Sequence, residues 1–179
     1  MAQSNLFLAT KQCLDTKDPA EKVALTTALY QAWQAGQLAL TNDQMIQPIG
    51  PPGRPERPRL VPPRELPQRR LHTEFGKAAL VHAIAHIEFN AINLALDAVY
   101  RFRNMPESYY GDWLQVALEE SHHFSLLQER LGECGCIYGD FDAHDGLWEM
   151  AMVTAHDPLI RMALVPRVLE ARGLDVTPG

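Results

Sequence analysis

Two long helical patterns, separated by only a few residues, constrain the fold of this chain most strongly. In the first, residues 73–102, apolar side chains recur at intervals of three and four: Leu80, Ile84, Ile87, Ala91, Leu94, Ala98 and Phe102. The second is predicted from about Ser108 to Leu131 and is followed by Gly132 and Gly135. Because the link 103–107 is so short, the two helices are expected to pack as antiparallel neighbours.

Shorter helices are predicted on both sides of this pair. In 18–36, Asp18 can cap a helix, Pro19 suits its first turn and Gly36 ends it. Its expected apolar stripe is Leu25, Ala28, Leu29, Ala32 and Trp33. Residues 145–156 and 157–171 predict two more helices. No segment shows a sustained alternation of apolar and polar residues, so the predicted fold class is all-α.

Proline and arginine dominate the segment before the long pair. Eight of the thirteen prolines fall in 48–67, a density that excludes helix and central strand. We expect an extended arm against an acidic body, with a basic strip for RNA as the alternative. That strip lacks the interleaved aromatic residues that base stacking requires. The expected organisation is an N-terminal helical segment 1–40, the arm 41–73 and a helical core 74–179, all in one domain.

Charge, hydropathy and cysteine content narrow the class of protein. The net charge of −6 offers no general attraction to nucleic acid or to an anionic membrane. The apolar runs are shorter than the roughly 20 residues of a membrane span, and the first residues do not read as a secretory signal. Three cysteines do not make a disulfide framework. We therefore expect a cytoplasmic protein with no membrane partner.

The stretch "LEESHHFSLL", residues 118–127, contains two carboxylates and two histidines in five positions. On a helix, residues three, four and seven apart share a face. Glu120 then lies among apolar residues and His123, so both are expected to point into the core. Glu119 and His122 are expected to lie on the solvent-exposed face of the helix.

Glu88 on the first long helix is also surrounded by apolar residues on its own face. A single buried glutamate is most simply explained by an arginine or lysine partner or by a bridging water. Glu88 opposite Glu120-x-x-His123 is a different pattern, because Glu facing Glu-x-x-His is half of a four-helix carboxylate di-metal site. Carboxylate and imidazole together suit iron or manganese. His82 and His86, by contrast, lie on a polar stripe and are expected to be structural or exposed.

Beyond these patterns, the sequence resembles the bacterial family catalogued as domain of unknown function 455, which has a ferritin-like pattern. The resemblance includes "DPAEKVALTTALYQAW", "GRPERPRLVPPRELPQRR", "HAIAHIEFNAINLALDAVYRF", "DWLQVALEESHHFSLL", "YGDFDAHDGLW" and "LEARGLDVTPG". It implies a ferritin-like helical bundle with metal ligands at Glu88, Glu120, His123 and Glu170. A more distant likeness to tRNA-modifying di-iron hydroxylases is at the level of fold alone.

The chain departs from that family pattern at its C-terminus. Relatives continue into a fourth core helix with a second acid-x-x-His motif, whereas this chain stops at Gly179. A fragment, a shortened product and completion by another subunit are the alternatives. An apolar groove left open by the absent helix would favour a homo-oligomer.

Two functions are therefore expected to compete. The first is a di-iron or iron–manganese carboxylate oxidoreductase acting on an unknown small molecule or RNA. The second is a non-catalytic helical interaction module whose metal site is incomplete and holds no metal. The absent fourth helix favours the second for this chain.

Overall fold

The computed structural model describes residues 4–41, 47, 49–67 and 72–167. Within them helices predominate, and the two strands, β1 (Ser4–Asn5) and β2 (Leu38–Ala39), are two residues long and pair in parallel. The all-α class is confirmed. The chain divides into two compact units, Met1–His144 and Asp145–Gly179. The boundary falls inside the segment expected as the core, 74–179.

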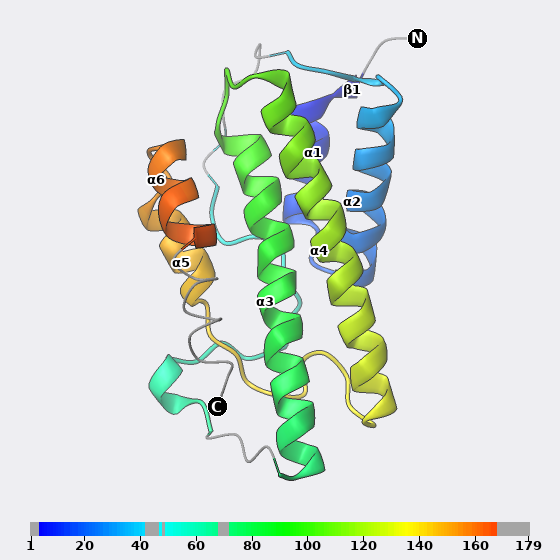
Figure 1. Cartoon of the computed structure of the whole chain (residues 1–179), viewed down its shortest axis with the longest axis vertical. Helices are drawn as coiled ribbons and strands as arrows, with labels where there is room; N and C mark the ends of the chain where they lie inside the picture. Colours follow the sequence, from blue (N-terminus) through cyan, green and yellow to red (C-terminus); the bar gives the residue numbers. More distant parts are fainter. Residues whose placement is uncertain (1–3, 42–46, 48, 68–71, 168–179) are drawn as a thin grey trace. The chain divides into compact units, whose positions relative to one another are not determined.

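Two long helices, α3 (Glu74–Arg101) and α4 (Glu107–Glu133), form an antiparallel pair in the first unit (Figure 1). Both lie close to their predicted bounds. Thr73 caps α3 by accepting a hydrogen bond from the Gly76 amide at 3.0 Å. The buried side chains of α4 recur at intervals of three, four or seven residues: Tyr110, Leu114, Ala117, Ser121, Phe124 and Leu131. The rings of Phe124 and Phe89 pack across the pair with centroids 5.4 Å apart.

The buried face of α3 differs in part from the predicted one, although Ala98 and Phe102 are buried as predicted. Ile84 and Ile87, both in the predicted stripe, are 37% and 50% exposed. The buried face instead includes His82, Ala85, His86, Phe89, Ile92, Asn93, Leu96 and Asp97. The prediction was wrong because it assumed that polar residues face water. A buried polar group costs little when a hydrogen-bond partner is folded against it, and these side chains have such partners.

Two shorter helices, α1 (Leu6–Asp15) and α2 (Pro19–Gln34), complete the helical part of this unit (Figure 1). Asp18 caps α2 as predicted, accepting from the Glu21 amide at 2.9 Å. Helix α1 was not predicted. Its signal is present in the sequence, because Asn5 caps the Phe7 and Leu8 amides and the buried residues that follow have helical spacing.

A lysine connects α2 to the rest of the core. The predicted apolar stripe of α2 is wrong in part, since Ala28 is exposed and the buried side chains are Lys22, Thr26 and Leu29. The Lys22 ammonium donates to Cys13 O at 3.0 Å, Leu14 O at 2.9 Å and Asn93 Oδ1 at 2.7 Å. Burial lowers the pKa of Lys22 to about 7. The protonated amine supplies three donors for three acceptors, so it ties the end of α1 to α3.

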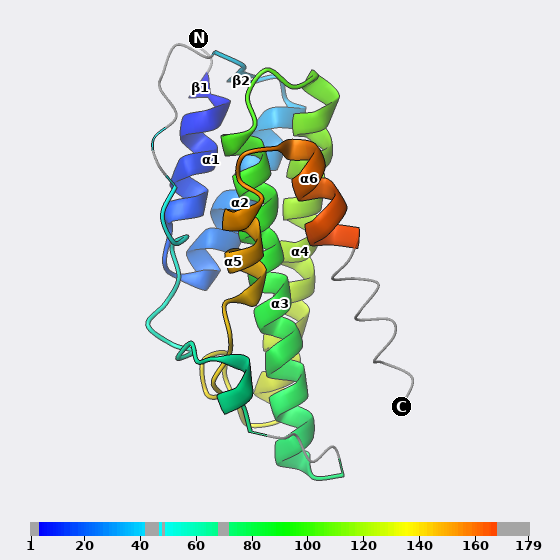
Figure 2. The same cartoon turned by 90° about the vertical axis from the view of Figure 1, so that its left-hand side faces the viewer.

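The described part of the proline-rich arm, residues 49–67, runs along the first unit and contains one 3₁₀ turn, Pro63–Glu65 (Figure 2). The Gly53 amide donates to Leu14 O at 2.8 Å, and Val61 donates to Ala143 O at 2.8 Å. Arg59 forms an ion pair with Asp142 at 2.6 Å. The arm is therefore docked by backbone hydrogen bonds at two places, as the extended-arm interpretation predicts.

The second unit begins with α5 (Gly146–Val153) and α6 (Pro158–Met162), followed by a π-helical turn, Ala163–Arg167. Asp157 caps α6 through the Leu159 and Ile160 amides at 2.7 and 3.0 Å. Arg161 is buried and donates to Thr154 Oγ1 at 2.8 Å. Residues 168–171 of the predicted last helix lie outside the described residues.

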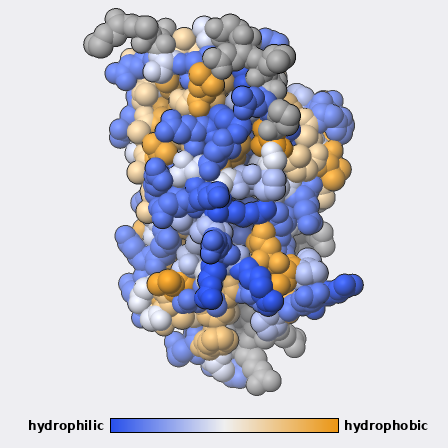
Figure 3. Space-filling model, turned by 180° about the vertical axis from the view of Figure 1, so that it is seen from behind, coloured by the Kyte–Doolittle hydropathy of each residue, from blue (hydrophilic) through white to orange (hydrophobic). Residues whose placement is uncertain are grey.

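Helix α3 is long and apolar enough, by length and composition alone, to cross a membrane. Half of its most apolar window is buried inside the protein, which is also typical of a core helix. The face seen in Figure 3 is largely hydrophilic, with apolar side chains in separate small patches. These features agree with the interpretation of α3 as a core helix.

Replacing Lys22 tests the lysine connection. Lys22→Met should lower the free energy of unfolding by about 3 kcal/mol, because buried acceptors lose their donor. The measurement is denaturant unfolding below pH 7, where Lys22, with its pKa of about 7, is protonated. Lys17→Met is the control, since Lys17 is exposed in the α1–α2 link. A Lys22→Met loss no larger than that of the control would contradict the assignment.

Docking of the arm depends on a glycine. A Cβ atom at Gly53 would lie 2.1 Å from Asp15 O, a backbone atom that cannot move aside freely, whereas a Cβ at Gly50 would meet nothing within 4 Å. Gly53→Ala should therefore cost roughly 1–3 kcal/mol of stability and expose the arm to protease. Gly50→Ala should do neither. Equal melting temperatures and equal cleavage rates for the two variants would refute the docked arrangement.

Candidate metal centre

Glu88 on α3 and the pair Glu120 and His123 on α4 come together in the first unit. One possible ligand atom from each of the three residues lies within 4.8 Å of the other two. His123 Nδ1 is 3.1 Å from Glu120 Oε2 and 3.8 Å from Glu88 Oε2. Glu120 and His123 are one helical turn apart on α4, and the antiparallel packing places Glu88 opposite them.

Glu120 and His123 were expected to point into the core, but the carboxylates are only partly buried and the imidazole is exposed. Glu88 and Glu120 have side chains that are 20% and 23% exposed, while Glu119 is exposed to solvent. His123 was expected to point into the core, and its side chain is 53% exposed. The reason is the α4 stripe through Ala117, Ser121 and Phe124, which fills the contact with α3. Glu120 and His123 therefore lie at the rim of that contact.

The two carboxyl groups of the site, Glu88 and Glu120, interact with each other, and this changes the pKa of Glu88. Burial and the neighbouring Glu120 carboxylate, which shares a hydrogen bond with it, raise the pKa of Glu88 to about 8. Glu88 therefore keeps its proton at neutral pH when nothing else binds there. A cation in the site would replace that proton and favour the carboxylate form.

Among the described residues, no lysine or arginine forms an ion pair with Glu88 or Glu120. The one ionisable side chain within ion-pair distance of them in this part of the chain is His123. The simplest expectation for a buried glutamate, a basic partner, is therefore not met in this part of the chain. Two carboxylates and an imidazole are a donor set that suits iron or manganese. The residues present fit a metal of this class.

The fourth predicted ligand, Glu170, lies outside the described residues. The structure thus brings together three of the four predicted residues.

A buried polar cluster beside the α3–α4 pair was not predicted from the sequence. His86 Nδ1 lies 2.8 Å from the Tyr138 hydroxyl, and His86 Nε2 lies 3.1 Å from the carbonyl oxygen of His144 and 3.0 Å from Asn90 Nδ2. Burial raises the pKa of Tyr138. The Tyr138 ring packs on Phe89 and Phe124, which neighbour Glu88 and His123 in sequence. The cluster fixes the segment after α4 against α3, and His86 is structural as expected.

Comparison with known proteins places this chain in a family. The model of the family described as "Protein of unknown function (DUF455)" matches residues 15–179. An uncharacterized protein of Haemophilus influenzae is 53% identical over 176 residues, covering 92% of this chain and 61% of that protein. The chain thus spans about three fifths of the length of this curated relative. No solved structure matches. With its family model matched from residue 15 to residue 179, the chain belongs to the DUF455 family.

Proposed function

We propose that Glu88, Glu120 and His123 bind iron or manganese, and that the protein is a carboxylate-centred oxidoreductase. The observation that supports the proposal is the convergence of three ligand atoms within 4.8 Å, from two helices. In the ferritin-like arrangement a second Glu and Glu-x-x-His set completes a two-ion centre. Glu170, or residues of another polypeptide, would supply the further ligands of a di-iron site.

A bound metal of this class would supply redox chemistry that amino-acid side chains lack. The residues of this chain would hold and tune it. Glu88 would give up its proton and become a ligand. His123 Nδ1, which lies 3.1 Å from Glu120 Oε2 and 3.8 Å from Glu88 Oε2, is the ring nitrogen that would face the metal. The Phe89 and Phe124 rings, packed against each other, would exclude water from the α3–α4 side of the site.

A second candidate function is a helical interaction module without metal. The supporting observation is the exposure of Ile87 on α3 and Leu126 on α4, at 50% and 48%. Exposed apolar side chains on neighbouring helices suit contact with another helix, including one from a second copy of the chain. The two candidates differ in their response to metal, because a metal that binds the folded protein raises its stability and a module without a metal site gains nothing.

The metal proposal predicts different effects for two adjacent, chemically identical residues. Glu120→Ala should abolish manganese or iron binding, because it removes a carboxylate at the site and the hydrogen-bond partner of His123. Glu119→Ala should leave metal binding unchanged, since Glu119 is exposed and accepts a hydrogen bond from Gln115. Metal at about one hundred times its Kd should stabilise the parent by about 2.7 kcal/mol, a gain that Glu120→Ala loses. Metal content and thermal unfolding measure both effects.

Equal metal content in the parent and in both variants, Glu119→Ala and Glu120→Ala, would reject the metal function. Absence of any metal response, together with self-association of the parent, would favour the interaction module.

The paired carboxylates also predict a pH dependence in the metal-free protein. The pKa of Glu88 is raised from 4.5 to about 8 on folding, so the native state binds more protons than the unfolded state between these values. The stability of the parent should therefore fall, relative to Glu88→Gln, as pH rises from 4.5 to about 8. Denaturant unfolding in the presence of chelator measures this difference, with Glu119→Gln as the control. Parallel pH profiles for the parent and Glu88→Gln would show that the two acids are not coupled.

A further inference from the structure

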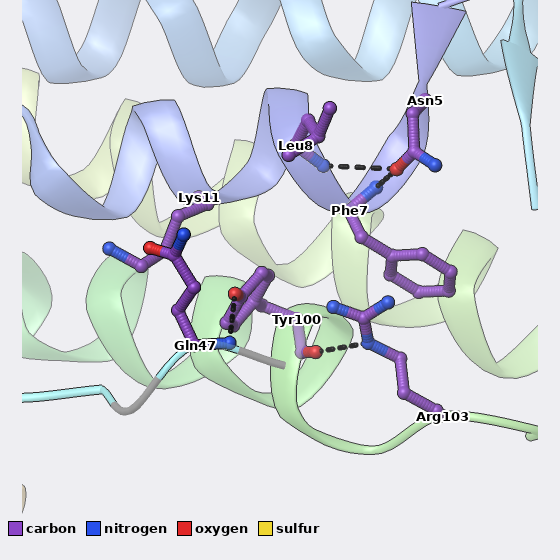
Figure 4. Close-up of a pocket in the computed structure, with 7 residues that line it drawn as sticks. All are labelled: Asn5, Phe7, Leu8, Lys11, Gln47, Tyr100 and Arg103. Atoms are coloured by element: carbon purple, nitrogen blue, oxygen red, sulfur yellow. Dashed lines mark hydrogen bonds between the residues drawn. The ribbon is translucent and has the colours of Figure 1, made fainter. Parts of the chain in front are cut away.

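A small cavity in the first unit contains an arginine that has no acidic partner among the described residues. Its volume is about 60 Å³. Its lining residues are Asn5, Phe7, Leu8, Lys11, Gln47, Tyr100 and Arg103 (Figure 4). Arg103 follows the C-terminal end of α3. At the α-helical rise of about 1.5 Å per residue, this end lies about 20 Å along the helix axis from Glu88. The cavity is therefore separate from the candidate metal centre.

The Arg103 guanidinium is held in a fixed plane. Its carbon lies 3.7 Å from the centre of the Phe7 ring and 4.9 Å from that of Tyr100. Its Nε donates to Tyr100 O at 2.7 Å. The Tyr100 hydroxyl in turn accepts from the Gln47 amide at 3.0 Å. These contacts occupy the faces and Nε of the group, and Figure 4 shows its two terminal amino groups between the Phe7 and Tyr100 side chains.

The charge of Arg103 is not balanced within the described part of the chain. No carboxylate lines the cavity, and the second cation, Lys11, forms an ion pair with Asp15. Burial lowers the pKa of Arg103, as expected where a charge is partly removed from water. An anion bound in the cavity would offset this partial loss of water around the guanidinium.

We propose that the cavity binds a tetrahedral oxyanion, a phosphate or sulfate group, through the terminal amino groups of Arg103. A guanidinium offers the parallel N–H donors that phosphate oxygens accept. The cavity volume agrees with the size of a phosphate group. A water-sized atom needs about 10–15 Å³, so 60 Å³ accommodates about four to six heavy atoms. Phosphate has five. Lys11 on the cavity wall is already paired with Asp15, so Arg103 is the cation that would bind the anion.

Phosphate titration of the full chain tests the proposal, with sodium chloride at equal ionic strength as the reference. Saturable binding is expected by calorimetry, together with a shift of the Arg103 Nε–H resonance in the nuclear magnetic resonance spectrum of the parent. Glycerol phosphate separates the two sources of the anion: binding equal to that of phosphate assigns the site to the end of a larger ligand, and weaker binding assigns it to the free ion. Acetate that binds as tightly as phosphate would overturn the tetrahedral assignment.

Two variants locate the binding. Arg103→Lys keeps the charge but loses the planar fork, and should weaken phosphate binding by about ten-fold or more. Arg130→Lys is the control, since Arg130 is exposed and paired with Glu133. No saturable phosphate binding by the parent, or equal affinity in all three proteins, would overturn the proposal. The Arg103 resonance of the parent decides the question even if Arg103→Lys does not fold.

Discussion

Two carboxylates that share a hydrogen bond across a helix–helix contact need a proton or a cation between them. In this protein they are Glu88 and Glu120, and the pKa of Glu88 is raised to about 8 because burial disfavours its charged form and its neighbour is another acid. The packing of α3 against α4 determines that they meet. The α4 stripe fills the contact, and the site residues are left at its rim, where they are partly exposed to water. Such a position would give a bound metal both ligands and access.

The other polar groups buried in this chain show how unusual the acid pair is. Lys22 has three acceptors for its three donors, and the buried Arg161 donates to Thr154 Oγ1. Each is satisfied by internal hydrogen bonds and stabilises a junction between segments. The pair of Glu88 and Glu120, and the guanidinium of Arg103, lack a countercharge of this kind among the described residues. Those are the two places where a ligand from outside the chain would complete the electrostatics.

Much of this arrangement was accessible from the sequence, and the rest has a physical reason for being missed. Helix positions and the antiparallel pair follow from spacing and caps, and the contrast between Glu119 and Glu120 follows from helix geometry. The buried face of α3 did not follow, because hydrophobic periodicity counts His82 and Asn93 as water-facing. Their partners, the Gly139 amide and Lys22, are 57 and 71 residues away in sequence. Burial of such groups depends on distant contacts that no local pattern records.

The most direct test of the metal site is X-ray diffraction from crystals of the manganese-loaded protein, with an anomalous difference map at the manganese edge. The account predicts a peak within about 2.5 Å of a carboxylate oxygen of Glu88 and of Glu120 and of a ring nitrogen of His123. An intact α3–α4 pair with no peak at these residues, or a peak at Glu119 and His122 instead, would contradict it.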